Sequence, residues 1–194
     1  MGSEMCIRDS LYMPSIMRDF PEFHYDEMKS RAENVLTSYL QSITKQNPAL
    51  LSEGTRELKE QLRLRLEMLQ NQSQKESFEN IHIHRTEIHQ YRKQRGRQSI
   101  VLQTAVEYFH ALKENGKVIR GSEEHKEQAK YNVELVYIQD QDMIENQEDA
   151  GLGLNCPNCG APLPGLGAKK CIYCDTPIVE YNLRVWNFSR VEEV

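Results

Sequence analysis

The spacing of apolar residues predicts two helices in the first part of the chain. Between residues 22 and 46, apolar side chains recur mostly at intervals of three and four, which is the period of a helix with one apolar face. These positions are Met28, Ala32, Val35, Leu36, Tyr39, Leu40 and Ile43. Pro21 precedes this stretch and Asn47-Pro48 ends it. A second apolar stripe follows at Leu58, Leu62, Leu66 and Leu69, with Thr55 as the predicted N-cap and an end near residues 71–74.

After residue 80 the period changes to two, which predicts β-strands. Ile81 and Ile83 alternate with histidines, and Ile88 follows after a predicted bulge. One face of a long second strand then carries Ile100, Leu102, Thr104, Val106 and Tyr108. Asn115-Gly116 marks a turn, which we expect to lead into a polar loop reaching to about Lys130.

Two further strands are predicted towards the end of the chain. Tyr131, Val133, Leu135 and Tyr137 share one face of the third strand, and residues 179–190, with the single tryptophan Trp186, form the last. Residues 139–150 are acidic and polar and indicate a linker. Helices segregated from antiparallel strands predict an α+β fold, in which the helices lie across one face of a twisted sheet.

The composition fits a soluble, globular chain of one domain plus a small module. Its 194 residues are 39% hydrophobic and 27% charged. The net charge of −5 argues against non-specific nucleic-acid binding by the whole surface. No run of about 18 apolar residues predicts a membrane-spanning helix, and the first residues lack the apolar core of a signal peptide.

Two Cys-x-x-Cys pairs carry the strongest chemical signal. CPNCG at 156–160 and CIYCD at 171–175 predict a tetrahedral zinc site with the ligands Cys156, Cys159, Cys171 and Cys174. Gly160 and Asp175, which follow the pairs, tolerate the left-handed backbone that such turns often need. Four thiolates close the coordination shell, so we expect structural rather than catalytic zinc. Reduced thiolates favour a cytoplasmic location.

Two alternative interpretations of these cysteines are a pair of disulfides and a redox-active Cys-x-x-Cys. The presence of two Cys-x-x-Cys pairs disfavours both. A deaminase-type catalytic zinc needs His-x-Glu together with Pro-Cys-x-x-Cys. His125-Lys126-Glu127 supplies the first part, but Asn155 and Lys170 stand where the proline is needed. We therefore expect His125 to lie in a polar loop without a metal role.

A basic turn offers a second candidate site. Arg92, Lys93, Arg95 and Arg97 cluster around Gly96, which favours contact with anionic lipid or phosphate, or else a solvated hairpin tip. His82, His84 and His89 could bind a metal, but they are more typical of a surface or a pocket wall. No Gly-rich phosphate loop, nucleophile elbow or metalloprotease helix occurs, so no catalytic residues are predicted.

The chain resembles a bacterial family over about residues 20–194. The stretches IHIHRTEIHQYRKQ, SIVLQTAVEYFHALKENGKVI and YNVELVYIQD, then LNCPNCGAPLPGLGAKKCIYCDTPI and VWNFSR, resemble Tim-forty-four-like domain proteins with a zinc ribbon. The resemblance implies a cystatin-like (nuclear transport factor two-like) cone, in which helices pack within a curved antiparallel sheet. It also implies zinc on the four cysteines, membrane association, and lipid or protein partners. It implies no catalytic residues.

This resemblance divides the chain into a Tim-forty-four-like domain, residues 11–145 plus 179–194, and an inserted zinc ribbon, residues 150–178. The first functional hypothesis is a non-enzymatic, membrane-associated adaptor that docks anionic lipid or a protein partner. A small-molecule-binding or enzymatic pocket in the cone is the second. A zinc-ribbon nucleic-acid binder ranks last, because the ribbon holds only two basic residues, Lys169 and Lys170.

The opening residues raise a separate question. Residues 1–10, MGSEMCIRDS, match the translation of a transposase-type sequencing adapter in which GTG is the start codon. We therefore expect native sequence from about Leu11, with Cys6 outside the metal site. A membrane anchor upstream of Leu11 would then be missing from this sequence, and the domain would work at the cytoplasmic face of a membrane.

Overall fold

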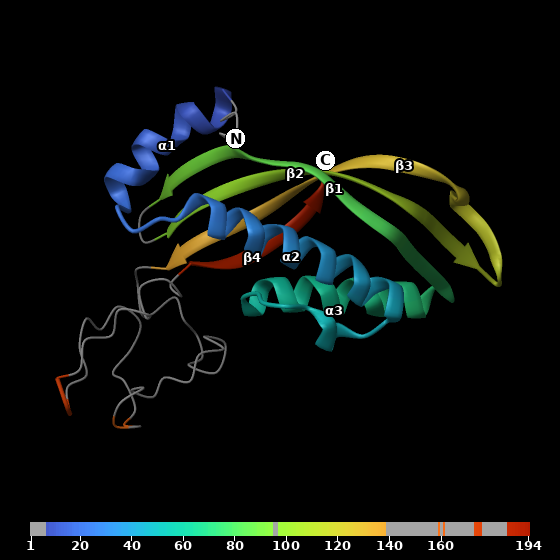
Figure 1. Ribbon diagram of the computed structural model, residues 1–194. Helices are drawn as coiled ribbons and strands as arrows, with labels where there is room; N and C mark the ends of the chain where they lie inside the picture. Colours follow the sequence, from blue (N-terminus) through green and yellow to red (C-terminus); the bar gives the residue numbers. More distant parts are fainter. Residues whose placement is uncertain (1–6, 95–96, 139–158, 160, 162–172, 176–185) are drawn as a thin grey trace.

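The computed structural model describes residues 7–94, 97–138, 159, 161, 173–175 and 186–194. These residues form helices followed by an antiparallel sheet (Figure 1), which confirms the α+β prediction. The elements in chain order are α1 (Ile7–Asp19), α2 (Tyr25–Lys45), the 3-10 turn η1 (Pro48–Leu50), α3 (Arg56–Asn71), β1 (Gln74–Gln94), β2 (Arg97–Glu114), β3 (Lys117–Ile138) and β4 (Trp186–Glu193).

The two predicted helices are confirmed as α2 and α3. Every apolar residue of the two predicted stripes is buried. The Thr55 hydroxyl accepts a hydrogen bond from the Leu58 N–H at 3.4 Å, as expected of an N-cap. Helix α2 ends at Lys45, and the left-handed φ of 51° at its C-cap, Gln46, turns the chain out of the helix.

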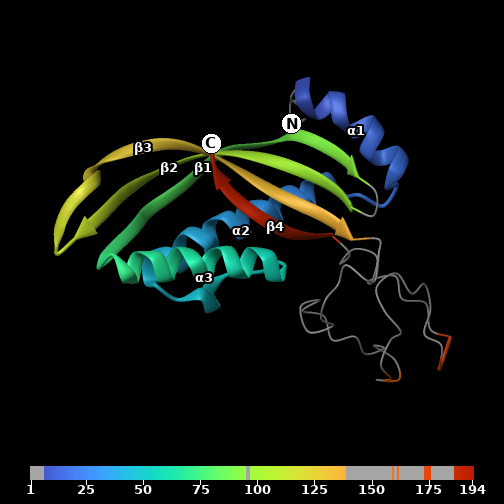
Figure 2. The same cartoon turned by 180° about the vertical axis from the view of Figure 1, so that it is seen from behind.

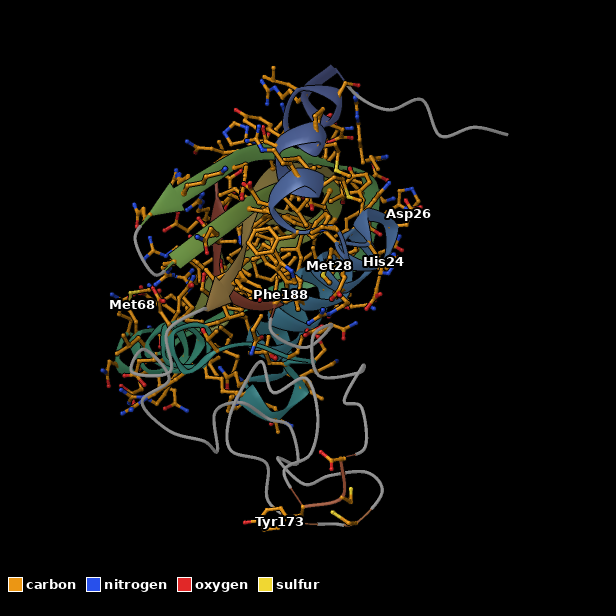
Figure 3. All side chains as sticks on the ribbon, turned by 90° about the vertical axis from the view of Figure 1, so that its left-hand side faces the viewer. His24, Asp26, Met28, Met68, Tyr173 and Phe188 are labelled. Atoms are coloured by element: carbon orange, nitrogen blue, oxygen red, sulfur yellow. The ribbon has the colours of Figure 1, made fainter. Side chains whose placement is uncertain are left out.

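The sheet has the order β1-β2-β3-β4 and arches over α2 and α3 (Figures 1 and 2). Bulges interrupt the register of all three strand pairs, and bulges of this kind bend and twist a sheet. The concave face packs against the helices in one hydrophobic core. Met28 of α2 and Phe188 of β4, labelled in Figure 3, are both fully buried in this core.

The predicted polar loop before Lys130 is wrong, because residues 117–130 belong to β3. Asn115 and Gly116 form a tight turn with φ angles of 49° and 80°, and Glu114 pairs directly with Lys117. The β2–β3 hairpin extends past the ends of the helices (Figure 1), so its strands contact water and lack apolar alternation. Strand β1 begins at Gln74, earlier than the expected Ile81, and its early residues Glu76 and Phe78 are buried.

Helix α1 was not predicted. It holds Pro14 and only a weak apolar pattern, but Ile16 is fully buried in the core. Packing against β1 therefore supports a helix that intrinsic propensity alone does not indicate. Residues 1–6 lie outside the described residues, and the adapter interpretation of residues 1–10 stays a prediction.

The outer edge of β1 is closed by side chains from two helices. The buried Asp9 carboxylate of α1 accepts a hydrogen bond from the Ile88 N–H at 2.7 Å. Towards the other end of the strand, the Thr44 hydroxyl of α2 accepts one from the Phe78 N–H at 2.9 Å. These bonds satisfy backbone groups that would otherwise offer a template for another strand.

The outer edge of β4 is closed in the same way by α3. The Gln61 amide donates to the Val191 carbonyl at 2.5 Å and accepts from the Val191 N–H at 3.3 Å, as a neighbouring strand would. The Thr55 N–H donates to the Phe188 carbonyl at 2.8 Å. Both edges of the sheet are therefore tied to the helices that fill its concave face.

Candidate functional site

The cysteine motifs lie in the connection between two neighbouring strands. Tyr137 near the end of β3 pairs directly with Trp186 at the start of β4. The chain thus leaves the sheet and returns to it at one place, as expected of an insertion before the last strand. The predicted boundaries at residues 145, 150 and 178 lie outside the described residues.

The described part of this connection includes one cysteine of each pair. Cys159 is exposed and Cys174 is half-buried. Asp175, directly after the second pair, has a φ of 56°, which confirms the expectation of a left-handed residue there. Tyr173, inside the second pair, is 66% exposed (Figure 3). Cys156, Cys171 and Gly160 lie outside the described residues.

The residues present fit zinc by their donor chemistry. Four thiolates in two closely spaced pairs are a common structural zinc set, and a left-handed residue after such a pair is compatible with a turn that aims both sulfurs at one point. Within the described part of the chain, no group of three or more His, Cys, Asp or Glu side chains is placed to hold a metal ion. Because that part omits half of the cysteine set, the zinc site stays a prediction.

Four aromatic rings pack where this connection joins the sheet. Trp186, only 3% exposed, lies 4.8 Å from the Phe20 ring, 5.5 Å from Phe23 and 5.1 Å from Tyr137, measured between ring centroids. Phe20 and Tyr137 also contact each other at 4.6 Å. We call these four residues the aromatic base, because they hold both strands at the root of the insertion.

Arg31 of α2 stabilises the aromatic base through contacts with Trp186. Its guanidinium donates to the Trp186 carbonyl at 2.9 Å and to both carboxylate oxygens of Glu53, at 3.0 and 2.6 Å. The same group lies 5.5 Å from the centroid of the Phe188 ring. The first residues of β4 are therefore fixed to α2 and to the segment before α3.

The predicted basic turn is less available for phosphate than its sequence indicates. Lys93 contacts Asp19, and its hydrogen bond is the main cause that lowers the pKa of this carboxyl group. Arg97 lies 3.3 Å from Glu57. Arg92 is exposed, and Arg95 lies outside the described residues. Exposed ion pairs of this kind are weak and can be displaced, so contact with anionic lipid stays a prediction.

The histidines of β1 do not form a metal cluster among the described residues. The rings of His82 and His84 are 4.9 Å apart and nearly perpendicular. His84 has a carboxylate neighbour that the sequence did not reveal, Glu107, at 3.3 Å. That carboxylate also accepts a hydrogen bond from Lys126, which is the main cause of its lowered pKa.

Sequence reasoning missed a buried ionic cluster at the other end of the sheet. His110 and Glu76 are 5% and 7% exposed and contact each other, and Glu76 also contacts Arg65. The alternation from Ile100 to Tyr108 reaches His110 two residues later, so the sequence carried a signal for its burial. Its partner Glu127 was missed because the sequence was expected to form a polar loop before Lys130.

Comparison with known protein families and with curated proteins finds no match. Of the helices that the structure describes, none is long and apolar enough to cross a bilayer.

Proposed function

We propose that this protein is a non-enzymatic adaptor that displays a structural zinc ribbon on a cystatin-like domain of the Tim-forty-four-like type. One observation carries the proposal: the cysteine motifs are inserted between adjacent strands on a fixed aromatic base, while helices fill the concave face of the sheet. In such an arrangement the recognition surface is the inserted module, and the sheet and helices are its support.

The concave face offers little support for an enzyme. Two pairs of buried hydroxyl groups there bond to each other: the Tyr108 and Tyr131 hydroxyls are 2.9 Å apart, and those of Thr86 and Thr104 are 3.1 Å apart. A ligand pocket normally presents convergent polar groups that are not satisfied within the protein. These pairs instead resemble polar links within a packed core.

The proposed adaptor docks an anionic lipid surface or a protein partner at the cytoplasmic face of a membrane. Support for lipid comes from Arg92 and its basic neighbours, and from the family resemblance. Support for a protein partner comes from the inserted module, whose exposed Tyr173 gives an aromatic contact of the kind enriched in protein interfaces. Nucleic acid ranks below both, given the net charge of −5.

The test combines metal content with vesicle flotation. The purified chain is expected to carry one zinc ion, which Cys159→Ser and Cys174→Ser should remove. At low salt it should float with phosphatidylserine-containing vesicles but not with phosphatidylcholine alone, and Arg92→Glu should reduce flotation. If the wild-type chain carries zinc but does not float with the vesicles, the lipid partner is ruled out and a protein partner is the remaining form of the proposal. Absence of zinc from the intact chain would contradict the proposal itself.

A further inference from the structure

The buried ionic cluster joins four elements at the hairpin end of the sheet. His110 of β2 places its Nε2 atom 3.0 Å from Glu76 of β1 and its Nδ1 atom 2.7 Å from Glu127 of β3. Arg65 of α3 contacts the second oxygen of Glu76 at 2.5 Å through Nη2 and at 3.1 Å through Nε. We call these four residues the charge cluster.

A carboxylate oxygen lies beside each ring nitrogen of His110. An ionised carboxylate can only accept, and a neutral imidazole has a single N–H, so this arrangement favours the imidazolium, which carries an N–H on both nitrogens. Burial raises the pKa of Glu76, but hydrogen bonds and charges from His110 and Arg65 outweigh burial and lower it overall. Glu127, the second carboxyl group in contact with the ring, is 43% exposed.

We propose that His110 is a pH-sensitive lock: its imidazolium, held between Glu76 and Glu127, ties β1, β2 and β3 together at neutral pH, and its deprotonation releases the hairpin end of the sheet. The Phe78 ring stacks on the imidazole at 4.8 Å and 17°, which keeps the ring plane in line with both carboxylates. This device is independent of the zinc ribbon and of the proposed adaptor function.

The backbone of β3 is shaped to bring Glu127 to this place. Ser122 pairs opposite His110 and Glu127 opposite Tyr108, so four residues of β3 bulge out opposite Phe109. Gly121 has a φ of 79°, and a Cβ atom there would lie 2.1 Å from the His110 carbonyl oxygen. Only glycine allows β3 to come this close to His110.

Other titratable groups near the cluster keep their charge state over the relevant range. Burial raises the pKa of Tyr108 to about 12 and raises that of Tyr131 and of Tyr39. These phenols, from β2, β3 and α2, therefore stay neutral over this range. His110 is therefore the group of this cluster that changes charge as the solution passes from neutral to alkaline pH.

The direction of the pH effect follows from the shift of His110. Burial lowers the pKa of His110, but the hydrogen bond to Glu76 and the charges of Glu127 and Glu76 outweigh burial and raise it overall. A raised folded-state pKa gives stability that is fully present below the unfolded value of about 6.5 and is lost as pH rises through the folded value. In alkaline solution Glu76 then keeps Arg65 as its charged partner, and Glu127 loses the charge of the ring beside it.

Long-range proton–nitrogen NMR of the His110 ring tests the lock directly. Between pH 5.5 and 10 we expect the wild-type ring to titrate with a midpoint above that of an unperturbed imidazole, whose pKa is about 6.5. Glu127→Gln should lower the titration midpoint by about one pH unit or more, because it removes a charge in contact with the ring. Glu123→Gln, on the same strand but paired with Lys113, is the matched control and should leave the midpoint unchanged.

Urea unfolding at pH 6.5 and 9.5 gives a second readout. Wild type should lose more stability on going to pH 9.5 than Glu127→Gln does. A His110 midpoint at or below about 6.5, or equal midpoints in the Glu127→Gln and Glu123→Gln variants, would overturn the proposal. An identical drop in stability for wild type and Glu127→Gln would overturn it as well.

Discussion

The two ends of the sheet are held together by opposite chemistry. At the root of the insertion, the aromatic base packs Phe20, Phe23 and Tyr137 around the buried Trp186. At the hairpin end, the charge cluster joins strands and helix through His110 and its ionic partners. Apolar contacts are insensitive to protonation, whereas buried ion pairs depend on the charge of each member.

This contrast assigns a different task to each end. The packing of the aromatic base should contribute a stability that changes little between pH 6.5 and 9.5. The charge cluster makes the long, polar β2–β3 hairpin conditional on the protonation of one side chain. Substitutions at the two ends should therefore differ more in how their effect on stability depends on pH than in how large that effect is.

The largest effect is expected from Trp186→Ala. Removing a buried tryptophan typically costs about 3–5 kcal/mol of unfolding free energy, through lost burial and the cavity left behind. Urea denaturation should show this loss equally at pH 6.5 and 9.5. Met68→Ala, at a 40% exposed position of α3 labelled in Figure 3, is the control and should change stability by less than about 0.5 kcal/mol. A loss below 1 kcal/mol for Trp186→Ala would remove the aromatic base as a structural element.

Glu76→Gln should come next. It leaves the His110 imidazolium and Arg65 without their shared buried partner, which we expect to cost about 2–3 kcal/mol at pH 6.5. The cost should shrink at pH 9.5, where His110 has lost its proton. Glu79→Gln, exposed on the same strand, is the matched control. A cost that is the same at both pH values would erase the proposed contrast between the two ends.

Gln61→Ala probes the closure of the β4 edge between the two ends. The variant loses two hydrogen bonds to the Val191 backbone, for an expected cost of about 1–2 kcal/mol. Hydrogen exchange at the Val191 amide should accelerate. After correction for intrinsic exchange rates, this acceleration should be nearly the same at pH 6.5 and 9.5. Gln70→Ala, exposed on the same helix, serves for comparison. Unchanged protection at Val191 would show that the side chain does not act as a strand.

Asn115→Gly should have the smallest effect. Asn115 has a φ of 49°, which glycine adopts without strain, so stability should change by no more than about 0.5 kcal/mol. Asn115→Val should instead destabilise the hairpin by about 1 kcal/mol or more, since a β-branched residue resists this conformation. Thermal unfolding of the pair checks the turn; equal stability of both variants would contradict the assigned geometry.

The parts of the fold that sequence predicted are those with one face buried. Helices α2 and α3 bury the predicted stripes, and β2 buries its predicted row from Ile100 to Tyr108. The first half of β3 was missed because its hairpin extends past the helices and has no apolar face. Helix α1 was missed because its main contacts, such as Asp9 to Ile88, are with a strand far along the chain.

The candidate sites also differ in how far the sequence could predict them. The cysteine pairs and the left-handed Asp175 were predictable, because short-range spacing determines the turn. His110 lies on a predictable row, but its partners Arg65, Glu76 and Glu127 come from three other elements. No local pattern shows that they meet, and the register of β3 depends on a bulge that the sequence did not indicate.

The measurement that tests the central claim most directly is zinc chelation followed by two signals at once. Trp186 is the only tryptophan, so its fluorescence reports on the aromatic base, while far-ultraviolet circular dichroism reports on the helices. If a zinc-stabilised module is carried by a separately stable domain, chelation and Cys159→Ser should both change the fluorescence and leave the helical signal in place. Loss of the helical signal on chelation, or a Trp186 signal that does not respond, would contradict this account.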